Sequence, residues 1–372
     1  MTNKIYISQG MLVAMIVNII YVKAIGVTQG TLARAVGQDM WIATLLGILQ
    51  GAVMIYATYL VVRAMPERDF IGIGEALLGR WFGILIALIF IVFFIAAFGP
   101  VMITFVYHLK DYFLPEAPLW MFIVAALLVG SLGCFYGLEV MGRIALVGMA
   151  FIFMLNLLIT IGSTHEFDIR NLLPVFESGV KRTAAASLHY DADCALAIML
   201  AALVLPIVKD VGKKGSRAAV MGIVVSGISV IMWAILESAV LSADVTSQYT
   251  VSCMKLARNA HIGDFLQRYE MIMIALYSLS ALFQVMFCIY GTAEGAARLF
   301  GLKNNKWTII PSSIVLGFFG YWVIEDHFRA IDYLEHYWPF IAVPIAFGMP
   351  LLMLGLSIMV GKKPDVSAAA SK

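Results

Sequence analysis

Residues 21–30 read YVKAIGVTQG, and they interrupt an apolar run that extends from about residue 8 to residue 35. A straight helix over the whole run would rise about 42 Å, well beyond the roughly 30 Å hydrocarbon core of a bilayer. The interruption contains a lysine and two glycines, which are poor residues for a continuous helix in lipid. We therefore predict a break at residues 23–27 that divides this run into two half-helices.

A second interruption lies in the run at about residues 178–208. Residues 177–189 are polar and amphipathic, the next four (190–193) are Tyr-Asp-Ala-Asp, and an apolar half follows. A helix that starts at residue 177 would rise about 20 Å before it reaches the aspartates, which places them well inside a membrane. We predict a second break at this point.

The composition of the whole chain explains why these runs are read as membrane segments. Of the 372 residues, 62% are hydrophobic and 13% are charged, and the mean hydropathy is +0.93. A soluble domain is about 45–50% apolar and about 25% charged. These values exclude a soluble enzyme, a nucleic-acid-binding protein and a disordered chain. The net charge of +2 is too small to indicate a nucleic acid as partner.

A window of roughly 20 mostly apolar residues finds ten candidate spans. We therefore predict an all-α integral membrane protein with a single transmembrane domain over residues 1–363 and a disordered cytoplasmic tail over residues 364–372. The spans lie at about residues 8–35, 39–64, 80–109, 116–137, 138–163, 178–208, 217–241, 264–299, 307–325 and 334–361. An even number of spans places both termini on the same side.

The distribution of Lys and Arg indicates which side that is, because cytoplasmic loops carry an excess of positive charge. The short loops at residues 209–217 and 303–306 are rich in basic residues and share a side with both termini. Both termini are therefore predicted to be cytoplasmic. The longer polar stretches that precede the sixth and the eighth span are predicted to be outside.

The two interrupted runs are five spans apart. Interrupted segments at corresponding positions of two halves are the best sequence indicator of a transporter-type binding site. Unwound backbone leaves N–H and C=O groups that a bound amino acid would satisfy in lipid. The pattern is consistent with a five-plus-five inverted repeat whose halves cover about residues 8–163 and 178–361. Composition alone leaves this repeat open, and no similarity between the halves is visible.

Three ionisable residues in the interruptions are candidates for a ligand site, because a charge inside a span is costly and by default functional. Lys23 would neutralise Asp191 or Asp193, or bind a ligand carboxylate; alternatively, it would extend outward to the membrane surface. Each aspartate would bind a ligand ammonium, a cation or a proton. Alternatively, one of them would only cap the second half-helix.

Residues near the centres of two other spans are further candidates. Gly99 precedes a proline that should kink its helix, and Thr104 lies about one turn further along. Tyr277, Ser280 and Gln284 follow an i, i+3, i+7 spacing, which places them on one helix face. That face would line a pocket; alternatively, its polar groups would only join neighbouring helices.

The sequence carries no catalytic or metal-binding motif. The patterns GxSxG, HExxH and Walker A are absent, the four cysteines show no CxxC spacing, and the six histidines do not cluster. We predict that the chain is not an enzyme and that it uses no cofactor or metal.

Three motifs occur in order along the chain: ARAVGQDMWI at residues 33–42, NLLPV at residues 171–175 and HIGDFLQRYE at residues 261–270. Together with ten predicted spans, they make the chain similar to the B subunit of the spore germination nutrient receptors. That family is a branch of the amino acid–polyamine–organocation (APC) transporter superfamily. The resemblance covers essentially the whole chain.

The resemblance implies a LeuT-type fold with the first and sixth spans broken. It implies a midplane pocket for a germinant, usually an amino acid, that is lined by the first, third, sixth and eighth spans. It also implies a location in the spore inner membrane beside an A subunit and a lipoprotein C subunit, and signalling through ion release. The chain departs from the family at the first break, where Gln-Gly-Thr-Leu (29–32) replaces an expected Leu-Pro after the glycine.

We expect the ligand site to be formed by residues from these four spans. They are Lys23, Gly26, Val27, Gly99, Thr104, Tyr190, Asp191, Asp193, Tyr277, Ser280, Phe283 and Gln284. The same fold also supports two other functions: active transport of an amino acid or organocation, and a structural or channel subunit whose pocket is vestigial. The ordered motifs favour nutrient sensing over both.

Overall fold

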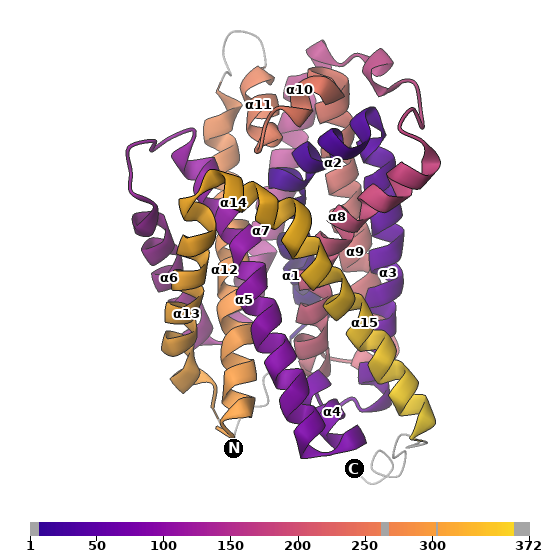
Figure 1. Ribbon diagram of the computed structural model, residues 1–372, viewed down its shortest axis with the longest axis vertical. Helices are drawn as coiled ribbons and strands as arrows, with labels where there is room; N and C mark the ends of the chain where they lie inside the picture. Colours follow the sequence, from indigo (N-terminus) through magenta and orange to yellow (C-terminus); the bar gives the residue numbers. More distant parts are fainter. Residues whose placement is uncertain (1–6, 262–267, 303, 361–372) are drawn as a thin grey trace.

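The computed structural model describes residues 7–261, 268–302 and 304–360. Long helices that run roughly alongside one another make up most of the molecule (Figure 1). They are α1 (Gln9–Lys23), α2 (Gln29–Val36), α3 (Met40–Ala64), α5 (Arg80–Lys110), α6 (Leu119–Tyr136), α7 (Leu138–Ser163), α8 (Val180–Val204), α9 (Val211–Leu236), α12 (Tyr269–Leu299), α13 (Lys306–Glu325) and α15 (Trp338–Met359).

Shorter elements cover the two ends of this bundle. The helix α4 (Phe70–Leu78) lies at the lower end in Figure 1, close to the C-terminal end of α15. The helices α10 (Ala243–Ser247), α11 (Ser252–Asn259) and α14 (His327–Asp332) lie at the upper end. Three five-residue π-helical segments adjoin the helices: Ala24–Thr28 joins α1 to α2, Glu237–Leu241 ends α9, and Tyr333–Tyr337 joins α14 to α15.

Nine helical segments in the described chain are long and apolar enough to cross a membrane. The first of them, Gln9–Ala64, has 56 residues and combines the two predicted spans 8–35 and 39–64. Gly37, with φ of 58°, turns the chain between α2 and α3 inside this segment. The fold is therefore that of an all-helical membrane protein, and the predicted number of ten spans is not confirmed.

Most of the other span predictions agree with the helices to within a few residues. The predicted span 217–241 begins too late, because α9 starts at Val211 and its helix continues as a π-helical segment to Leu241, so most of the predicted loop 209–217 is helical. The predicted span 80–109 corresponds to α5, the span 138–163 corresponds to α7, and the span 307–325 corresponds to α13. The predicted disordered tail 364–372 and the start of the predicted span 264–299 lie outside the described residues.

The predicted break in the first span takes a different form, because the chain stays helical through it. Residues Ala24–Thr28 form a π-helical segment between α1 and α2, in which the hydrogen-bond register changes without unwinding. Side chains take up carbonyl groups there: Gln29 Nε2 donates to Ala24 O at 3.3 Å, and Thr31 Oγ1 donates to Val27 O at 3.3 Å. The local backbone is thus satisfied without an open gap.

The predicted break in the sixth span is wrong. The helix α8 continues through residues 190–193, and its N-cap is Gly179 rather than an aspartate. The sequence of α8 contains no glycine or proline and is rich in alanine, the strongest helix former. Asp191 and Asp193 occupy interior helix positions because their carboxylates find partners on other helices.

Helix α1 lies among α7, α8, α9 and α12, and a polar network holds it there. The Trp233 indole on α9 donates to Tyr21 Oη and to Asn156 Oδ1, both at 2.8 Å, while Tyr21 donates to Asn156 at 2.6 Å. Asn18 Nδ2 donates to Ala145 O on α7 at 2.8 Å. Buried hydrogen bonds of this kind fix the rotation of α1 about its own axis.

Glycines bring α3 close to α8. A Cβ atom on Gly47 would lie 2.8 Å from the Tyr190 ring, and one on Gly51 would lie 2.6 Å from Cys194 Sγ. Small residues at an interface let membrane helices approach closely. This contact fixes the position of α8, which carries Asp193.

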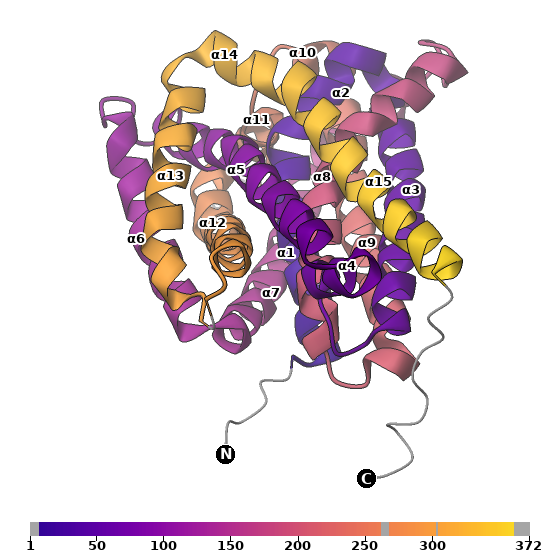
Figure 2. The same ribbon diagram turned by 60° about the horizontal axis from the view of Figure 1, so that its bottom comes forward.

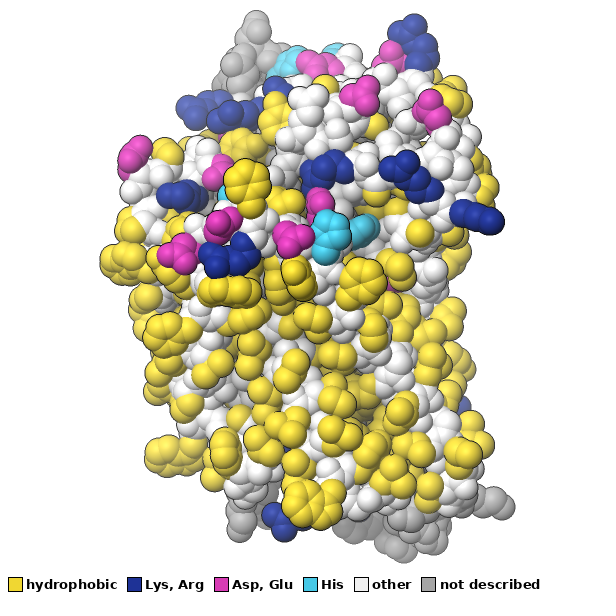
Figure 3. All heavy atoms as spheres, in the orientation of Figure 1, with side chains coloured by type: hydrophobic (Ala, Val, Ile, Leu, Met, Phe, Trp, Pro, Cys, Tyr) yellow, Lys and Arg dark blue, Asp and Glu magenta, His cyan; other side chains and the backbone are white. Residues whose placement is uncertain are grey.

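The surface reflects the membrane setting. Hydrophobic side chains cover the middle and lower parts of the visible face, whereas charged side chains gather in its upper part (Figure 3). Large apolar residues such as Phe318 (76% exposed) and Phe340 (77% exposed) point outward, as expected for groups that face lipid. The turned view shows α6 and α13 along one side of the bundle and α3 and α15 along the other (Figure 2).

We predict that Gly51→Val destabilises the protein by about 1–3 kcal/mol, because the added side chain overpacks the contact between α3 and α8. Gly355→Val is the matched control, since a Cβ atom on Gly355 would meet nothing within 4 Å. Thermal unfolding of the two purified variants in detergent measures the difference. Equal melting temperatures would show that the close approach of the helices does not limit stability.

Candidate functional site

A buried ion pair joins α1 to α8. Lys23 Nζ, at the C-terminal end of α1, contacts Asp193 Oδ1 in the middle of α8. The Lys23 side chain is 9% exposed and that of Asp193 is 0% exposed. Lys23 also donates to Thr28 Oγ1 at 3.4 Å. Of the alternatives for Lys23, the structure shows the ion pair rather than an extension toward the membrane surface.

The two aspartates of α8 face different partners. Residues two positions apart on an α-helix point about 200° apart, so Asp191 lies on the opposite side from Asp193. The Gln50 amide on α3, with its nitrogen turned toward α8, donates to the Asp191 carboxylate at 2.7 and 3.0 Å. The continuous helix therefore separates a carboxylate that contacts a neutral amide from one that contacts a cation.

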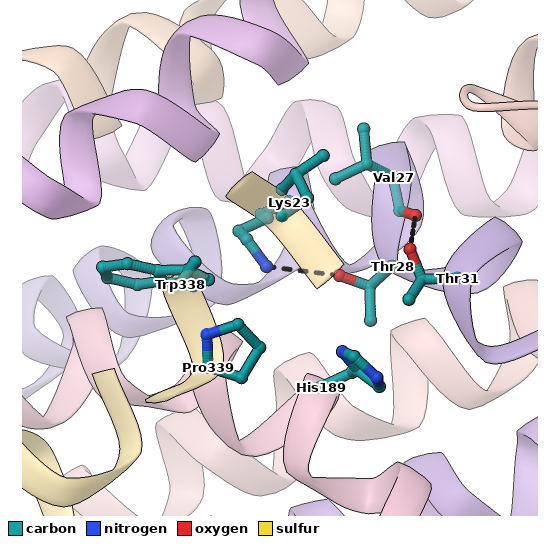
Figure 4. A pocket seen from close by; sticks show the side chains of 8 residues that line it. Lys23, Val27, Thr28, Thr31, His189, Trp338 and Pro339 are labelled. Carbon is teal, nitrogen blue, oxygen red and sulfur yellow. Dashed lines mark hydrogen bonds between the residues drawn. The ribbon is translucent and has the colours of Figure 1, made fainter. Parts of the chain in front are cut away.

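A small cavity lies beside the Lys23 ammonium (Figure 4). Its volume is about 10 Å³, which is room for roughly one water molecule. The lining comes from the end of α1, the π-helical segment Ala24–Thr28, α2 and α8, together with Leu334 just before α15 and the first two residues of α15. The lining residues are Lys23, Val27, Thr28, Thr31, His189, Leu334, Trp338 and Pro339.

Two buried polar atoms at this site have no partner within the described part of the chain. They are Asp193 Oδ2, the second oxygen of the paired carboxylate, and Trp338 Nε1. Both residues are almost fully buried, with exposures of 2% and 1%. An unsatisfied buried donor or acceptor costs about 1–3 kcal/mol. The site therefore holds one unused acceptor and one unused donor.

A second cluster surrounds Gly26 in the π-helical segment. A Cβ atom on Gly26 would lie 2.7 Å from Thr104 Cγ2, 3.0 Å from Tyr277 Oη and 3.1 Å from His108 Cε1. Tyr277 Oη donates to Val22 O at 3.0 Å, and its ring stacks on that of His108 at 4.6 Å between centroids. The structure thus brings together Gly26, Thr104 and Tyr277, which were predicted from the sequence as separate candidates.

His108 and its neighbour Cys253 were not among the predicted site residues. His108 Nε2 lies 3.3 Å from Cys253 Sγ on α11, and its Nδ1 lies 2.5 Å from Thr104 O. One signal was available in the sequence, because His108 follows Thr104 by four residues in an apolar helix and so lies on the same face. The contact with Cys253 depends on the tertiary fold.

The other predicted site residues lie elsewhere. Tyr190 packs against Gly47 on α3, and Gly99 approaches Tyr333. Gln284 donates to Ile19 O at 2.5 Å and so joins α12 to α1. Two further residues are completely buried outside the cavity lining: Ser280, which lies near Gly148 on α7, and Phe283. Of the predicted set, Val27 and Lys23 line the cavity.

A second ion pair, Arg34–Glu335, lies next to residues that line the cavity. Arg34 on α2 donates to Glu335 Oε1 at 2.8 and 2.6 Å. The same guanidinium donates to Ser247 O at 3.0 Å and to Thr31 Oγ1 at 3.2 Å. Thr31 and Leu334, the chain neighbour of Glu335, both line the cavity. Arg34 therefore ties together two walls of the cavity.

The described residues contain no group of three His, Cys, Asp or Glu side chains that would hold a metal ion. The chemistry that the site offers is ion pairing and hydrogen bonding to a small molecule.

Solved structures with a similar arrangement of helices are transporters with a LeuT-like fold. A Na⁺-coupled sialic acid symporter in a substrate-bound, outward-open state aligns with a TM-score of 0.67 at 11% identity, over 93% of this chain and 78% of the symporter. MhsT in complex with L-phenylalanine aligns with a TM-score of 0.63 at 14% identity, over 94% of this chain and 88% of MhsT. The chain is therefore a multi-pass integral membrane protein of this fold class.

A family model described as spore germination protein matches residues 6–327. The chain belongs to this family of permease-like membrane proteins, which are not enzymes. The spore germination protein YndE of Bacillus subtilis (strain 168) is 25% identical over 372 residues, which is 96% of this chain and 97% of YndE.

Two other relatives carry related names. The spore germination protein KB of Bacillus subtilis (strain 168) is 23% identical over 77% of each chain. The spore germination protein GerQB of Bacillus cereus is 23% identical over 77% of this chain and 79% of GerQB. The family resemblance predicted from the three ordered motifs is confirmed.

We predict that Lys23→Met lowers the free energy of unfolding by about 3–5 kcal/mol, because it leaves the Asp193 carboxylate buried without a counter-charge. The double variant Lys23→Met/Asp193→Leu should recover most of that loss, since it removes both charges. Thermal unfolding of the full chain in detergent gives the comparison.

Arg143→Met is a matched control, because the Arg143–Glu139 pair is 68% and 44% exposed and should contribute less than about 1 kcal/mol. If the double variant were as unstable as Lys23→Met, charge burial would not explain the loss.

Proposed function

We propose that this chain is the nutrient-sensing B subunit of a spore germination receptor and that it binds a small amino acid or similar nutrient at the Lys23–Asp193 site. The observation that supports this role is a buried ion pair beside a cavity, between α1 and α8, in a member of the spore germination protein family. The relatives named KB and GerQB support assignment to the B subunit.

Binding requires a change at the site, because the cavity has room for roughly one water molecule. Two ion pairs must separate to admit a nutrient: Lys23–Asp193 beside the cavity and Arg34–Glu335 above it. A ligand shifts a conformational equilibrium only by its difference in affinity for the two states. The nutrient therefore acts by stabilising a state in which these pairs are rearranged.

The site communicates with the rest of the molecule through the helices that carry the charges. Arg34 contacts both Ser247, the last residue of α10, and Glu335, which lies in the π-helical segment before α15. A rearrangement of the cavity would move these elements relative to one another. We propose that an A subunit and a lipoprotein C subunit in the spore inner membrane receive this change and that ion release follows.

The membrane topology belongs to the same proposal. We propose that Gln9–Ala64 crosses twice, because Gly37 turns the chain and α3 runs back from the upper to the lower end (Figure 1). The total is then ten crossings in a single transmembrane domain, with repeats at about residues 8–163 and 178–361. Both termini are then cytoplasmic, and α10, α11 and α14 lie on the outer side.

An alternative function is secondary active transport of an amino acid or organocation. The solved structures of similar fold favour it, since one is a Na⁺-coupled sialic acid symporter and another is MhsT in complex with L-phenylalanine. The two functions differ in a measurable way: a transporter concentrates its substrate across a membrane, whereas a sensor only binds it.

Accumulation of radiolabelled amino acids in sealed proteoliposomes separates the two functions. We expect binding to detergent-opened vesicles without concentrative uptake into sealed ones. Vesicles that contain Asp193→Asn are the matched control for binding at the site. Uptake beyond binding, driven by a proton or sodium gradient, would make the chain a transporter.

Spores that carry Asp193→Asn should germinate with a nutrient response at least about tenfold weaker, because a charge-assisted hydrogen bond to the ligand is lost. The chain itself should still accumulate in the membrane, which immunoblotting checks. An unchanged dose response would remove Asp193 from the ligand site.

Fusions test the proposed topology. A fluorescent protein joined after residue 372 should fold and fluoresce, whereas alkaline phosphatase at the same position should be inactive, because the C-terminus is cytoplasmic. A phosphatase inserted at residue 248, beside α10, should be active. The opposite pattern would invert the topology.

A further inference from the structure

A larger cavity lies on the outer surface of the bundle, away from the Lys23–Asp193 pair. Its volume is about 380 Å³, which falls in the range of about 300–1,000 Å³ that is typical of small-molecule sites. Two helices form it, α6 and α13, which lie along one side of the molecule (Figure 2). Apart from Ser131 and Ser313, its lining is apolar. We refer to this cavity as the α6–α13 groove.

The two serines of the groove satisfy one another. Ser313 Oγ donates to Ile309 O at 2.9 Å, so the only hydrogen of this hydroxyl is engaged. Ser131 Oγ therefore donates to Ser313 Oγ, at 2.8 Å between the oxygens, and this bond joins the two walls. An occupant of the groove needs to offer no hydrogen bond, and an apolar chain leaves no polar group of the walls unsatisfied.

The two walls run antiparallel. Ser131 meets Ser313, and a Cβ atom on Gly317, one turn further along α13, would lie 2.8 Å from Leu127 Cδ1, one turn back along α6. The end of α6 therefore lies beside the start of α13. This end of the groove belongs to the lower end of the bundle, where α13 begins (Figure 1).

The length of the groove matches one leaflet of a bilayer. Its lining on α6 extends from Val124 to Phe135, over which a helix rises about 16 Å. The hydrocarbon of one leaflet is about 15 Å deep, half of the roughly 30 Å core. Leu128, Leu132 and Ile310 are exposed, so the groove faces lipid. A transmembrane helix, about 10–12 Å across, is too wide to enter between walls that are joined by a hydrogen bond, whereas an acyl chain is not.

A cation lies in line with the groove at its lower end. Lys306 is exposed and is the first residue of α13, and its spacing of four residues from Ile310 and of eight from Ile314 places all three on one helix face. The neighbouring Arg298 is engaged by Asp69 and Glu294. Lys306, by contrast, forms no ion pair with any residue that the structure describes.

Aromatic side chains mark the same level of the membrane. Trp307, at the start of α13, and Tyr136, at the end of α6, are both exposed. Tryptophan and tyrosine are enriched where the hydrocarbon core meets the headgroups. Lys306 is therefore placed at the depth of lipid phosphates, directly beyond the apolar part of the groove.

We propose that the α6–α13 groove binds one anionic glycerophospholipid, with an acyl chain along α6 and the phosphate beside the Lys306 ammonium. The apolar walls, the length of one leaflet and the unpaired cation at one end all match such a lipid. In the proposed topology the lipid belongs to the cytoplasmic leaflet. The site itself does not depend on that topology or on nutrient binding.

Two phospholipids that differ only in headgroup charge test the site. The full chain in detergent is titrated with dioleoyl phosphatidylglycerol, which is anionic, and with dioleoyl phosphatidylcholine, which is zwitterionic. Binding raises the melting temperature, because a ligand that binds only the folded state stabilises it. The anionic lipid should reach half of its effect at a concentration about fivefold lower, as expected for one basic residue near the membrane surface.

A groove-filling variant tests where the acyl chain lies. Ile314→Trp fills the groove, whereas Val315→Trp makes the same change at the next residue, which is outside the lining. The two positions are matched in exposure, at 54% and 49%. Ile314→Trp should raise the half-maximal concentration of both lipids at least about tenfold, because the acyl chain loses its close contacts. Val315→Trp should behave as the unmodified chain does.

A charge deletion tests where the phosphate lies. Lys306→Gln should abolish the preference for the anionic lipid, so that the two lipids stabilise the chain equally. The matched control is Lys214→Gln, which removes an exposed lysine from α9, a helix that does not line the groove. This control should keep the preference.

Several results would overturn the proposal. If Ile314→Trp and Val315→Trp responded alike, no acyl chain would occupy the groove, and if Lys306→Gln kept the preference, the phosphate would lie elsewhere. A chain that is dimeric when unmodified and monomeric as Ile314→Trp would show that a second copy covers the groove. Should Ile314→Trp not fold, phosphatidylglycerol with a photoreactive diazirine in its acyl chain decides on the unmodified chain in lipid nanodiscs. Its crosslinks should map to α6 and α13, and crosslinks confined to other helices would contradict the site.

Discussion

The cost of placing charge in a membrane is the constraint on which this structure depends. Lys23 and Asp193 are buried between two helices, and neither is tolerable there without the other. Their pairing fixes the end of α1 against the middle of α8. The packing around it follows, because the glycines of α3 set the position of α8 and the Tyr21–Asn156–Trp233 network sets the rotation of α1.

The long helices could be predicted from the sequence, because apolar runs of about 20 residues have few alternatives in lipid. The family also followed from motifs that the chain carries in order, and the match over residues 6–327 confirms it. The number of spans was harder to establish. The turn between α2 and α3 takes only the three residues Gly37–Asp39, so residues Gln9–Ala64 count as one long apolar helical segment.

The local form of the two interruptions could not be predicted from residue types. Lys23 and Gly26 indicate a weak point in a helix, which either unwinding or a π-turn can relieve. In the structure a π-turn forms, and Gln29 donates a hydrogen bond to the Ala24 carbonyl within it. At residues 190–193, the aspartates suggested a cap because capping is their usual role near a helix end. Their partners lie more than one hundred residues away in the chain, so local sequence carried no sign of a continuous α8. Similarly, Gly26, Thr104 and Tyr277 were separate candidates until the fold brought them together.

The two helices that share the ion pair differ in stiffness. Asp193 lies within an uninterrupted α-helix, so it is a fixed reference point for the site. Lys23 lies directly before a π-turn, which holds one more residue than an α-turn. If that extra residue moved along the helix, each side chain that it passed would rotate about the helix axis by about 100°. The chain would stay folded. The adjustable side of the site is therefore the one formed by α1, the π-helical segment and α2. Thr28, Thr31 and Arg34 would turn together as one unit.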